Sequence, residues 1–227
     1  STQEYNPYIT GSGSEEYWMN RIADAMEPYL RANTIRFTRN TPEMTAASSI
    51  AQAARGSYDF YLALHSNAST DGSREGFIRG IIAFYYPTSA NGRRAADIFV
   101  KELRNIYPLP DKVYASATTA LGEVRQPYMP SVLLELGYHD NTEDARWIEG
   151  NIESIAATLV LSLTEYFSLP FLTPLTPWQG TVRTPDGGGL NLRAAPGTRA
   201  DVVTLLPDGA KVTVYGRYQE WYTVGYE

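Results

Sequence analysis

Cysteine is absent from the chain, and histidine is rare: the 227 residues include only His65 and His139. The absence of cysteine excludes disulfide bonds, thiolate metal ligands and thiol catalysis. Any metal site that uses imidazole therefore depends on these two residues. No apolar run reaches the roughly 18 residues that a membrane-spanning helix needs, so no membrane span is expected.

Positive charge is also scarce. The chain has 19 Lys and Arg against 25 Asp and Glu, which gives a formal net charge of −6. Without a basic stripe to displace counterions from phosphates, nucleic acid is not an expected partner. Hydrophobic residues make up 43% of the chain, which is enough for a folded core.

Three prolines interrupt the stretch FSLPFLTPLTPWQ and break both helical and strand hydrogen bonding. They predict a linker over 168–179, between a domain at 1–167 and a smaller one at 180–227. The texture of the chain changes across this stretch, which supports the boundary.

Helical and strand patterns alternate before the linker, and this alternation predicts an α/β domain. Its sheet is expected to be mostly parallel and twisted, with helices on both faces. The spacing predicts helices over Glu16–Leu30, Ala46–Arg55, Arg93–Ile106 and most of Asn141–Phe167, and strands over Ile35–Thr38, Asp59–Leu64, Ile78–Tyr86 and Ser131–Leu136. After the linker, short alternating runs separated by Gly- and Pro-rich turns predict a small all-β barrel.

His65 follows the apolar strand Asp59–Leu64, and Asn67 comes two residues later. Neutral imidazole is a good zinc ligand, and Asn67 has the chemistry to fix the loop or bind a substrate carbonyl. A lone histidine at a strand end is more often structural, so the assignment depends on the other segments. Glu16, in the first predicted helix, is a second candidate ligand, although an acid at a helix start is also favoured by the helix dipole.

Glu135 lies inside the otherwise apolar strand SVLLEL. Charged side chains are almost never fully buried without a partner, and a buried carboxylate is costly unless it meets a metal, a proton or a cation. The alternative, a strand acid exposed by alternation, is weak because leucines flank it on both sides. Strand ends of parallel sheets gather functional residues, so Glu135 and His65 are expected to share one site.

Three segments in this order resemble the zinc-dependent N-acetylmuramoyl-L-alanine amidases of the type-3 family: EEYWMNRIADAMEPYL, LALHSNAS and PSVLLELGYHDN, with the TR of FTRN matching a family strand. The resemblance covers about 1–167. It implies one Zn²⁺ held by Glu16 and His65, and Glu135 as general acid/base. The implied reaction is hydrolysis of the amide bond between N-acetylmuramic acid and L-alanine in peptidoglycan.

The sequence departs from the family in the first zinc ligand, which is normally a histidine before the helix. Here that stretch reads STQEYNPYITGSGSEE and has no histidine. The alternatives for the third position are the amide oxygen of Gln3, the imidazole of His139, and water; the last alternative is that no metal is bound tightly. His139 is also a candidate for substrate binding.

The stretch 180–227 resembles a bacterial SH3-like domain, carried by LNLR, PDG and EWYTV. Trp221 and Tyr222 are its candidate wall-binding side chains, although Trp221 also suits the barrel core. The chain ends before the last strand such domains usually have, so an incomplete domain is expected. Together the two resemblances predict a secreted autolysin acting at the bacterial cell wall. The alternatives are a catalytically impaired peptidoglycan-binding protein and a zinc peptidase acting on stem peptides.

Overall fold

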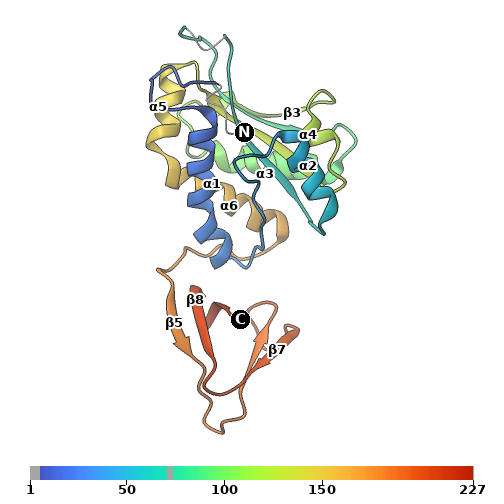
Figure 1. Cartoon of the computed structure of the whole chain (residues 1–227), viewed down its shortest axis with the longest axis vertical. Helices are drawn as coiled ribbons and strands as arrows, with labels where there is room; N and C mark the ends of the chain where they lie inside the picture. Colours follow the sequence, from blue (N-terminus) through green and yellow to red (C-terminus); the bar gives the residue numbers. More distant parts are fainter. Residues whose placement is uncertain (1–5, 71–73, 227) are drawn as a thin grey trace. The chain divides into compact units, whose positions relative to one another are not determined.

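The computed structural model describes residues 6–70 and 74–226 (Figure 1). The chain forms two compact units. The first contains the described residues up to Met26 together with Thr38–Leu169, and the second contains Glu27–Phe37 and the described residues from Pro170 onward. The predicted linker stretch therefore belongs mostly to the second unit.

The six α-helices of the described chain alternate with the strands of a four-stranded sheet. The helices are α1 (Glu15–Ala32), α2 (Ala46–Arg55), α3 (Ala90–Leu103), α4 (Gly122–Arg125), α5 (Thr142–Gly150) and α6 (Ile152–Phe167). The strands are β1 (Tyr61–Asn67), β2 (Ile81–Tyr85), β3 (Val113–Ala117) and β4 (Ser131–Tyr138), with a short 3₁₀ turn, η1, at Pro110–Lys112 before β3.

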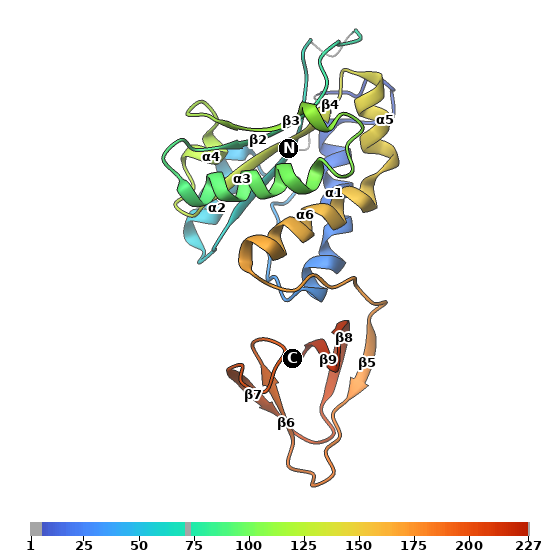
Figure 2. The ribbon, with the colours of Figure 1, turned by 180° about the vertical axis from the view of Figure 1, so that it is seen from behind.

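The sheet has the order β1-β4-β2-β3. β1 pairs parallel with β4, and β2 pairs parallel with β3, whereas β2 and β4 run antiparallel. Figure 1 shows α2 in front of this sheet, and the reverse view in Figure 2 shows α3 and α6 in front of it. The predicted α/β class with helices on both faces is confirmed, and the antiparallel β2–β4 pair is an addition that the sequence pattern did not indicate.

β4 is the central strand next to β1 and is buried along its length except at Glu135, which is partly exposed. Its apolar side chains pack on both faces because helices cover both. On one face, a small core cluster joins Ala63 of β1 and Leu133 of β4 to Val124 of α4. The register pairs His65 with Glu135 in neighbouring parallel strands, so both side chains leave the sheet on that same face.

An irregularity follows directly after this pair. The β1–β4 register shifts between His65 and Asn67. Gly137 has a positive φ of 99°, a backbone conformation that glycine adopts without steric cost. The regular β1–β4 pairing is therefore interrupted just beyond the two candidate residues, and it resumes at Asn67 and Tyr138.

The predicted strand over Ile35–Thr38 is wrong: this stretch has no strand partner and forms no regular structure. Strand propensity depends on context. Ile35 and Phe37 are partly buried in alternation with exposed neighbours, but no strand pairs with this stretch. Arg39, from the neighbouring predicted TR match, donates instead to Asp24 at 2.5 Å and to Asn20 at 3.0 Å. The helix over Ala46–Arg55 is confirmed with the predicted bounds.

Asp144, at the start of α5, is fully buried and organises the loops above the sheet. Its Oδ1 accepts hydrogen bonds from Arg79 Nε at 2.8 Å and from the Tyr107 hydroxyl at 2.6 Å. Its Oδ2 accepts from the backbone N–H groups of Gly80 and Tyr138. Each oxygen of this buried carboxylate is satisfied, as burial of a charge requires.

The second unit contains two antiparallel sheets, in the orders β5-β8-β9 and β6-β7. Their strands are β5 (Trp178–Thr181), β6 (Leu190–Arg193), β7 (Val202–Leu206), β8 (Lys211–Tyr218) and β9 (Trp221–Gly225). Val182, Leu206, Val212 and Val214 form its core. The same unit includes 27–37, where the Ala32 carbonyl accepts a hydrogen bond from Thr223 Oγ1 at 2.8 Å.

Candidate active site

His65 lies between two carboxylates, one on each ring nitrogen. Its Nδ1 is 3.0 Å from Glu15 Oε1, and its Nε2 is 2.9 Å from Glu123 Oε2. The three side chains come from β1, from the first turn of α1 and from the short helix α4. All three are partly shielded from solvent, with side-chain exposures of 35% for His65, 16% for Glu15 and 13% for Glu123.

Glu15 is held by further donors before any ligand is considered. Its Oε1 also accepts from the Ser66 backbone N–H at 3.1 Å, and its Oε2 accepts from Asn6 Nδ2 at 2.7 Å. Burial alone raises the pKa of Glu15, but the hydrogen bond and the charge of His65, with help from Asn6 and Ser66, hold that pKa below its usual range. Glu15 is therefore a fixed carboxylate.

Glu123 is placed in a similar way. Its Oε1 accepts a hydrogen bond from the Tyr61 hydroxyl at 2.9 Å. Burial acts to raise the pKa of Glu123, and the stronger effect of His65, supported by Tyr61, lowers it. The imidazole responds reciprocally: burial disfavours its charge, but the two carboxylates raise the pKa of His65 to about 10. The two carboxylates thus favour the charged form of the imidazole.

Glu135 is different from its two acidic neighbours. Its Oε2 is buried and has no hydrogen-bond partner among the described residues. Burial raises the pKa of Glu135 to about 7, with His65 opposing the shift and Glu15 and Glu123 adding to it. A carboxyl group that gains and loses a proton near neutral pH is suited to general acid/base work.

The structure places two of the predicted site residues, His65 and Glu135, in register on neighbouring strands, and the helix residue that contacts His65 is Glu15. Glu16 is partly exposed, whereas its neighbour Glu15 contacts the imidazole. A signal for Glu15 exists in the sequence. It lies four residues before Met19 and seven before Ile22, on the buried stripe of α1, and Glu16 lies one position around the helix from that stripe.

His139 is nearly fully buried, at 2% exposure. Its Nδ1 is 2.9 Å from the Ser66 carbonyl oxygen and 3.1 Å from the Ser66 hydroxyl. Its ring stacks on Tyr8 at a centroid distance of 5.6 Å. These contacts pack His139 against Ser66 near the end of β1.

Asn67 and Gln3 complete the set of predicted residues. Asn67 Oδ1 accepts from the Ala68 backbone N–H at 2.8 Å, and the Asn67 carbonyl accepts from the His139 N–H. Asn67 therefore shapes the loop after β1. Gln3 lies outside the described residues. Glu123 was not predicted, because a glutamate in the short segment LGEVRQ carries no pattern that marks it.

Within residues 6–70 and 74–226, no three His, Asp or Glu side chains form a complete set of metal ligands. Two side chains have donor atoms at a separation that suits a shared zinc ion. Ligand atoms about 2.1 Å from a tetrahedral zinc ion are about 3.4 Å apart, and Glu15 Oε1 and His65 Nδ1 are 3.0 Å apart. Glu15 and His65 are therefore the described residues that would hold such an ion. The unpartnered oxygen of Glu135 lies on the same face of the sheet.

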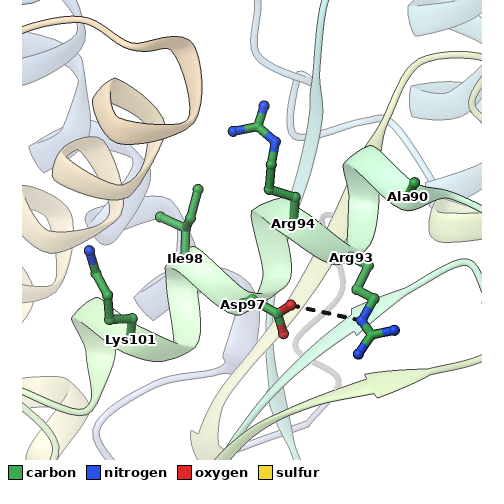
Figure 3. A pocket seen from close by; sticks show the side chains of 6 residues that line it. All are labelled: Ala90, Arg93, Arg94, Asp97, Ile98 and Lys101. Carbon is green, nitrogen blue, oxygen red and sulfur yellow. Dashed lines mark ion pairs between the residues drawn. The ribbon is translucent and has the colours of Figure 1, made fainter.

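A pocket elsewhere on this unit does not compete with that site. It runs along α3 and is lined by Ala90, Arg93, Arg94, Asp97, Ile98 and Lys101 (Figure 3). Arg93 pairs with Asp97 at 3.8 Å, and Lys101 pairs with Glu165 at 2.6 Å. Arg94 donates to the Tyr166 carbonyl oxygen and lies over the Tyr166 ring. The three cations of this pocket are thus already engaged, and they are poor candidates for ligand capture.

The side chains above β1 and β4 lie on an α/β domain with a mixed four-stranded sheet. Residues 6–164 match the family model described as N-acetylmuramoyl-L-alanine amidase. The chain belongs to this family, and it is an enzyme that hydrolyses amide bonds in peptidoglycan. Residues 188–227 match the model of the bacterial SH3 domain, which confirms the predicted resemblance of the C-terminal part.

Solved structures with the same fold include three N-acetylmuramoyl-L-alanine amidases. The catalytic domain of CwlV from Bacillus (Paenibacillus) polymyxa var. colistinus has a TM-score of 0.63 and 18% identity, over 75% of this chain and 94% of that one. AmiC2 of Nostoc punctiforme has a TM-score of 0.63 and 15% identity, over 74% and 92%. The amidase from Clostridium difficile 630 has a TM-score of 0.61 and 15% identity, over 74% and 91%. No curated protein matches the chain.

Proposed function

We propose that this protein is a zinc-dependent amidase that cleaves the bond between N-acetylmuramic acid and L-alanine. In this proposal Glu15 and His65 are zinc ligands, and Glu135 is the general acid/base. The observation that carries it is the unpartnered buried oxygen of Glu135 next to the Glu15–His65 pair. The family match supports the substrate.

Glu135 moves the proton in the reaction. Its carboxylate accepts a proton from water as the water oxygen bonds to the scissile carbonyl carbon. It then delivers that proton to the departing nitrogen as the C–N bond breaks, which yields a carboxylate and the free amine of L-alanine. A bound zinc ion would supply polarisation of the carbonyl and acidification of the water.

Glu15 and His65 prepare the ion site. The N–H groups of Asn6 and Ser66 fix the Glu15 carboxylate, so little conformational freedom is lost on binding. The third position remains with Gln3 or water in this proposal. His139 is less suited to it because its Nδ1 is engaged with Ser66.

The C-terminal unit is proposed to hold the enzyme on peptidoglycan, which places the protein outside the cell, at the wall. Tyr222 is 48% exposed and meets the equally exposed Trp178 edge-to-face at 6.2 Å. An exposed aromatic pair is a suitable surface for sugar rings. Trp221 is only partly exposed and lies outside the core cluster. Among the described residues, none of the helices has the length and hydropathy of a membrane span.

The adjacent glutamates of α1 provide a matched test. Glu15→Gln and Glu16→Gln change the same charge at neighbouring positions. We expect Glu15→Gln to lose zinc on dialysis, measured by elemental analysis, and Glu16→Gln to retain it. The opposite result would return the ligand role to Glu16.

Activity is measured on purified peptidoglycan through the release of new L-alanine amino groups. We expect Glu135→Gln to bind zinc normally and to lose about 10²- to 10⁴-fold in kcat. Wild-type protein that binds no zinc and releases no amino groups would overturn the proposed function and leave only wall binding.

A further inference from the structure

We propose that Glu123 is a positioning residue that holds the Nε2–H of His65 and thereby directs Nδ1 to the metal. The inference rests on the proposed zinc site and adds a residue that the family resemblance does not include. Three features support the inference: the two carboxylate contacts of His65, the hydrogen bond to the second oxygen of Glu123, and the contacts that anchor α4.

A neutral imidazole binds a metal through one nitrogen and keeps its proton on the other. His65 has a carboxylate at each nitrogen, at 3.0 and 2.9 Å. When Glu15 and Nδ1 share an ion, the remaining proton is on Nε2 and is donated to Glu123 Oε2. A histidine ligand whose second N–H meets a carboxylate is fixed in tautomer and ring orientation, and it becomes a stronger donor to the metal.

The second oxygen of Glu123 fixes the carboxylate itself. Its Oε1 accepts the hydrogen bond from the Tyr61 hydroxyl. Tyr61 lies four residues before His65 on β1, so both side chains emerge on the same face of the strand. Burial and the adjacent carboxylate raise the pKa of Tyr61, so its hydroxyl remains a donor. Glu123 thus bridges two side chains of one rigid strand.

The helix that carries Glu123 is anchored to the core. Val124 is 2% exposed and packs against Ala63 and Leu133. Its carbonyl accepts a hydrogen bond from Ser131 Oγ at 3.0 Å. A four-residue helix would otherwise be free to shift, but these contacts hold the residue next to Glu123 against the sheet.

Charge supports the same arrangement. Glu15 and Glu123 together carry two negative charges when both are ionised, which balances one divalent ion beside a neutral imidazole. Truncation of Glu123 leaves an imidazole N–H without its acceptor in a site of low exposure, and such a loss is costly.

Nitrogen NMR of ¹⁵N-histidine-labelled protein reads this arrangement directly, because the chain has only two histidines. In wild-type protein loaded with Zn²⁺, we expect His65 to show a protonated Nε2 and a metal-bound Nδ1. Loading with ¹¹³Cd²⁺ identifies the coordinating nitrogen through its coupling to the metal. Coordination through Nε2 would make Glu123 a direct neighbour of the ion and overturn the proposal.

Affinity gives a second readout, from competition for Zn²⁺ with a chromogenic chelator. We expect Glu123→Ala to weaken binding about 10- to 100-fold, and Glu123→Gln, which keeps an acceptor oxygen, to recover part of the loss. Glu153→Ala, an exposed change in the first turn of α6, is the control. An affinity in Glu123→Ala equal to that of wild type, with the fold intact by circular dichroism, refutes the role. A wild-type protein without zinc affinity instead refutes the metal site as a whole.

Discussion

Replacement of Glu135 by glutamine is expected to change how the stability of the metal-free protein depends on pH. Burial raises the pKa of Glu135 from 4.5 to about 7. The folded state therefore holds the proton more tightly than the unfolded state. Stability from this group is present below the unfolded pKa and is lost as pH rises through the folded pKa.

The size of the effect follows from the shift. One pKa unit corresponds to about 1.4 kcal/mol, so the whole window between pH 4.5 and 7 is worth about 3 kcal/mol. Between pH 5 and pH 8 the loss is about 2.5 kcal/mol, because part of the unfolded-state titration occurs below pH 5. Glutamine has a similar shape and does not titrate, so this loss disappears in Glu135→Gln.

Urea unfolding of metal-free wild type and Glu135→Gln at pH 5 and pH 8 measures the difference. The pKa of His65 in the folded state is about 10, so between pH 5 and pH 8 this residue titrates only in the unfolded state. That contribution is common to both proteins and largely cancels in the comparison. We expect the free energy of unfolding of Glu135→Gln, relative to that of wild type, to rise by about 2.5 kcal/mol from pH 5 to pH 8. The exposed change Glu153→Gln is the control. It should change the free energy of unfolding by the same amount at pH 5 and at pH 8. Parallel pH curves for wild type and Glu135→Gln would refute the buried-acid reasoning.

Three further predictions concern residues outside the reacting centre. Asp144→Ala leaves Arg79 with only the exposed Glu143 and leaves the buried Tyr107 hydroxyl without its acceptor, so it is expected to lower the free energy of unfolding by about 3–5 kcal/mol in urea titration. His139→Phe removes the contact with Ser66 and should cost about 1–3 kcal/mol while zinc stoichiometry stays unchanged; loss of zinc would instead identify His139 as the third ligand. Tyr222→Ala should reduce cosedimentation of the protein with insoluble peptidoglycan, whereas cleavage of soluble muropeptides should remain, and equal sedimentation would exclude this aromatic surface.

The strands that carry the site could be predicted because their physics is local. Apolar runs bounded by polar turns gave β1 and β4, and the cost of a buried charge marked Glu135 before any fold was known. The strand register then places His65 beside it. A strand order in which β2 runs antiparallel to β4 depends on long-range pairing, and no local pattern encodes it.

The two carboxylates that contact His65 could not be predicted from local sequence patterns. Glu15 and Glu16 differ by about 100° around a helix, and the choice between them depends on the phase of the buried stripe. Glu123 lies in a four-residue helix, too short for any periodicity. It reaches His65 only because Val124 fills a position in the core.

The buried acids of the first unit differ in how fully their oxygens are satisfied. Asp140 lies between the extremes: its Oδ1 has no partner within the described residues, but its Oδ2 accepts from the backbone N–H groups of Ser69 and Thr70. Asp144 is fully buried, but each of its oxygens accepts hydrogen bonds, so it contributes to stability. Glu135 keeps a buried oxygen without a partner within the described residues, on a face where Leu133 and Ala63 show that an apolar side chain is accommodated. A chain retains such a costly group where a carboxyl that exchanges its proton near neutral pH is needed. The stability lost at Glu135 is thus an argument for its chemical role, and the satisfied Asp144 shows that this domain has the means to pair a buried carboxylate.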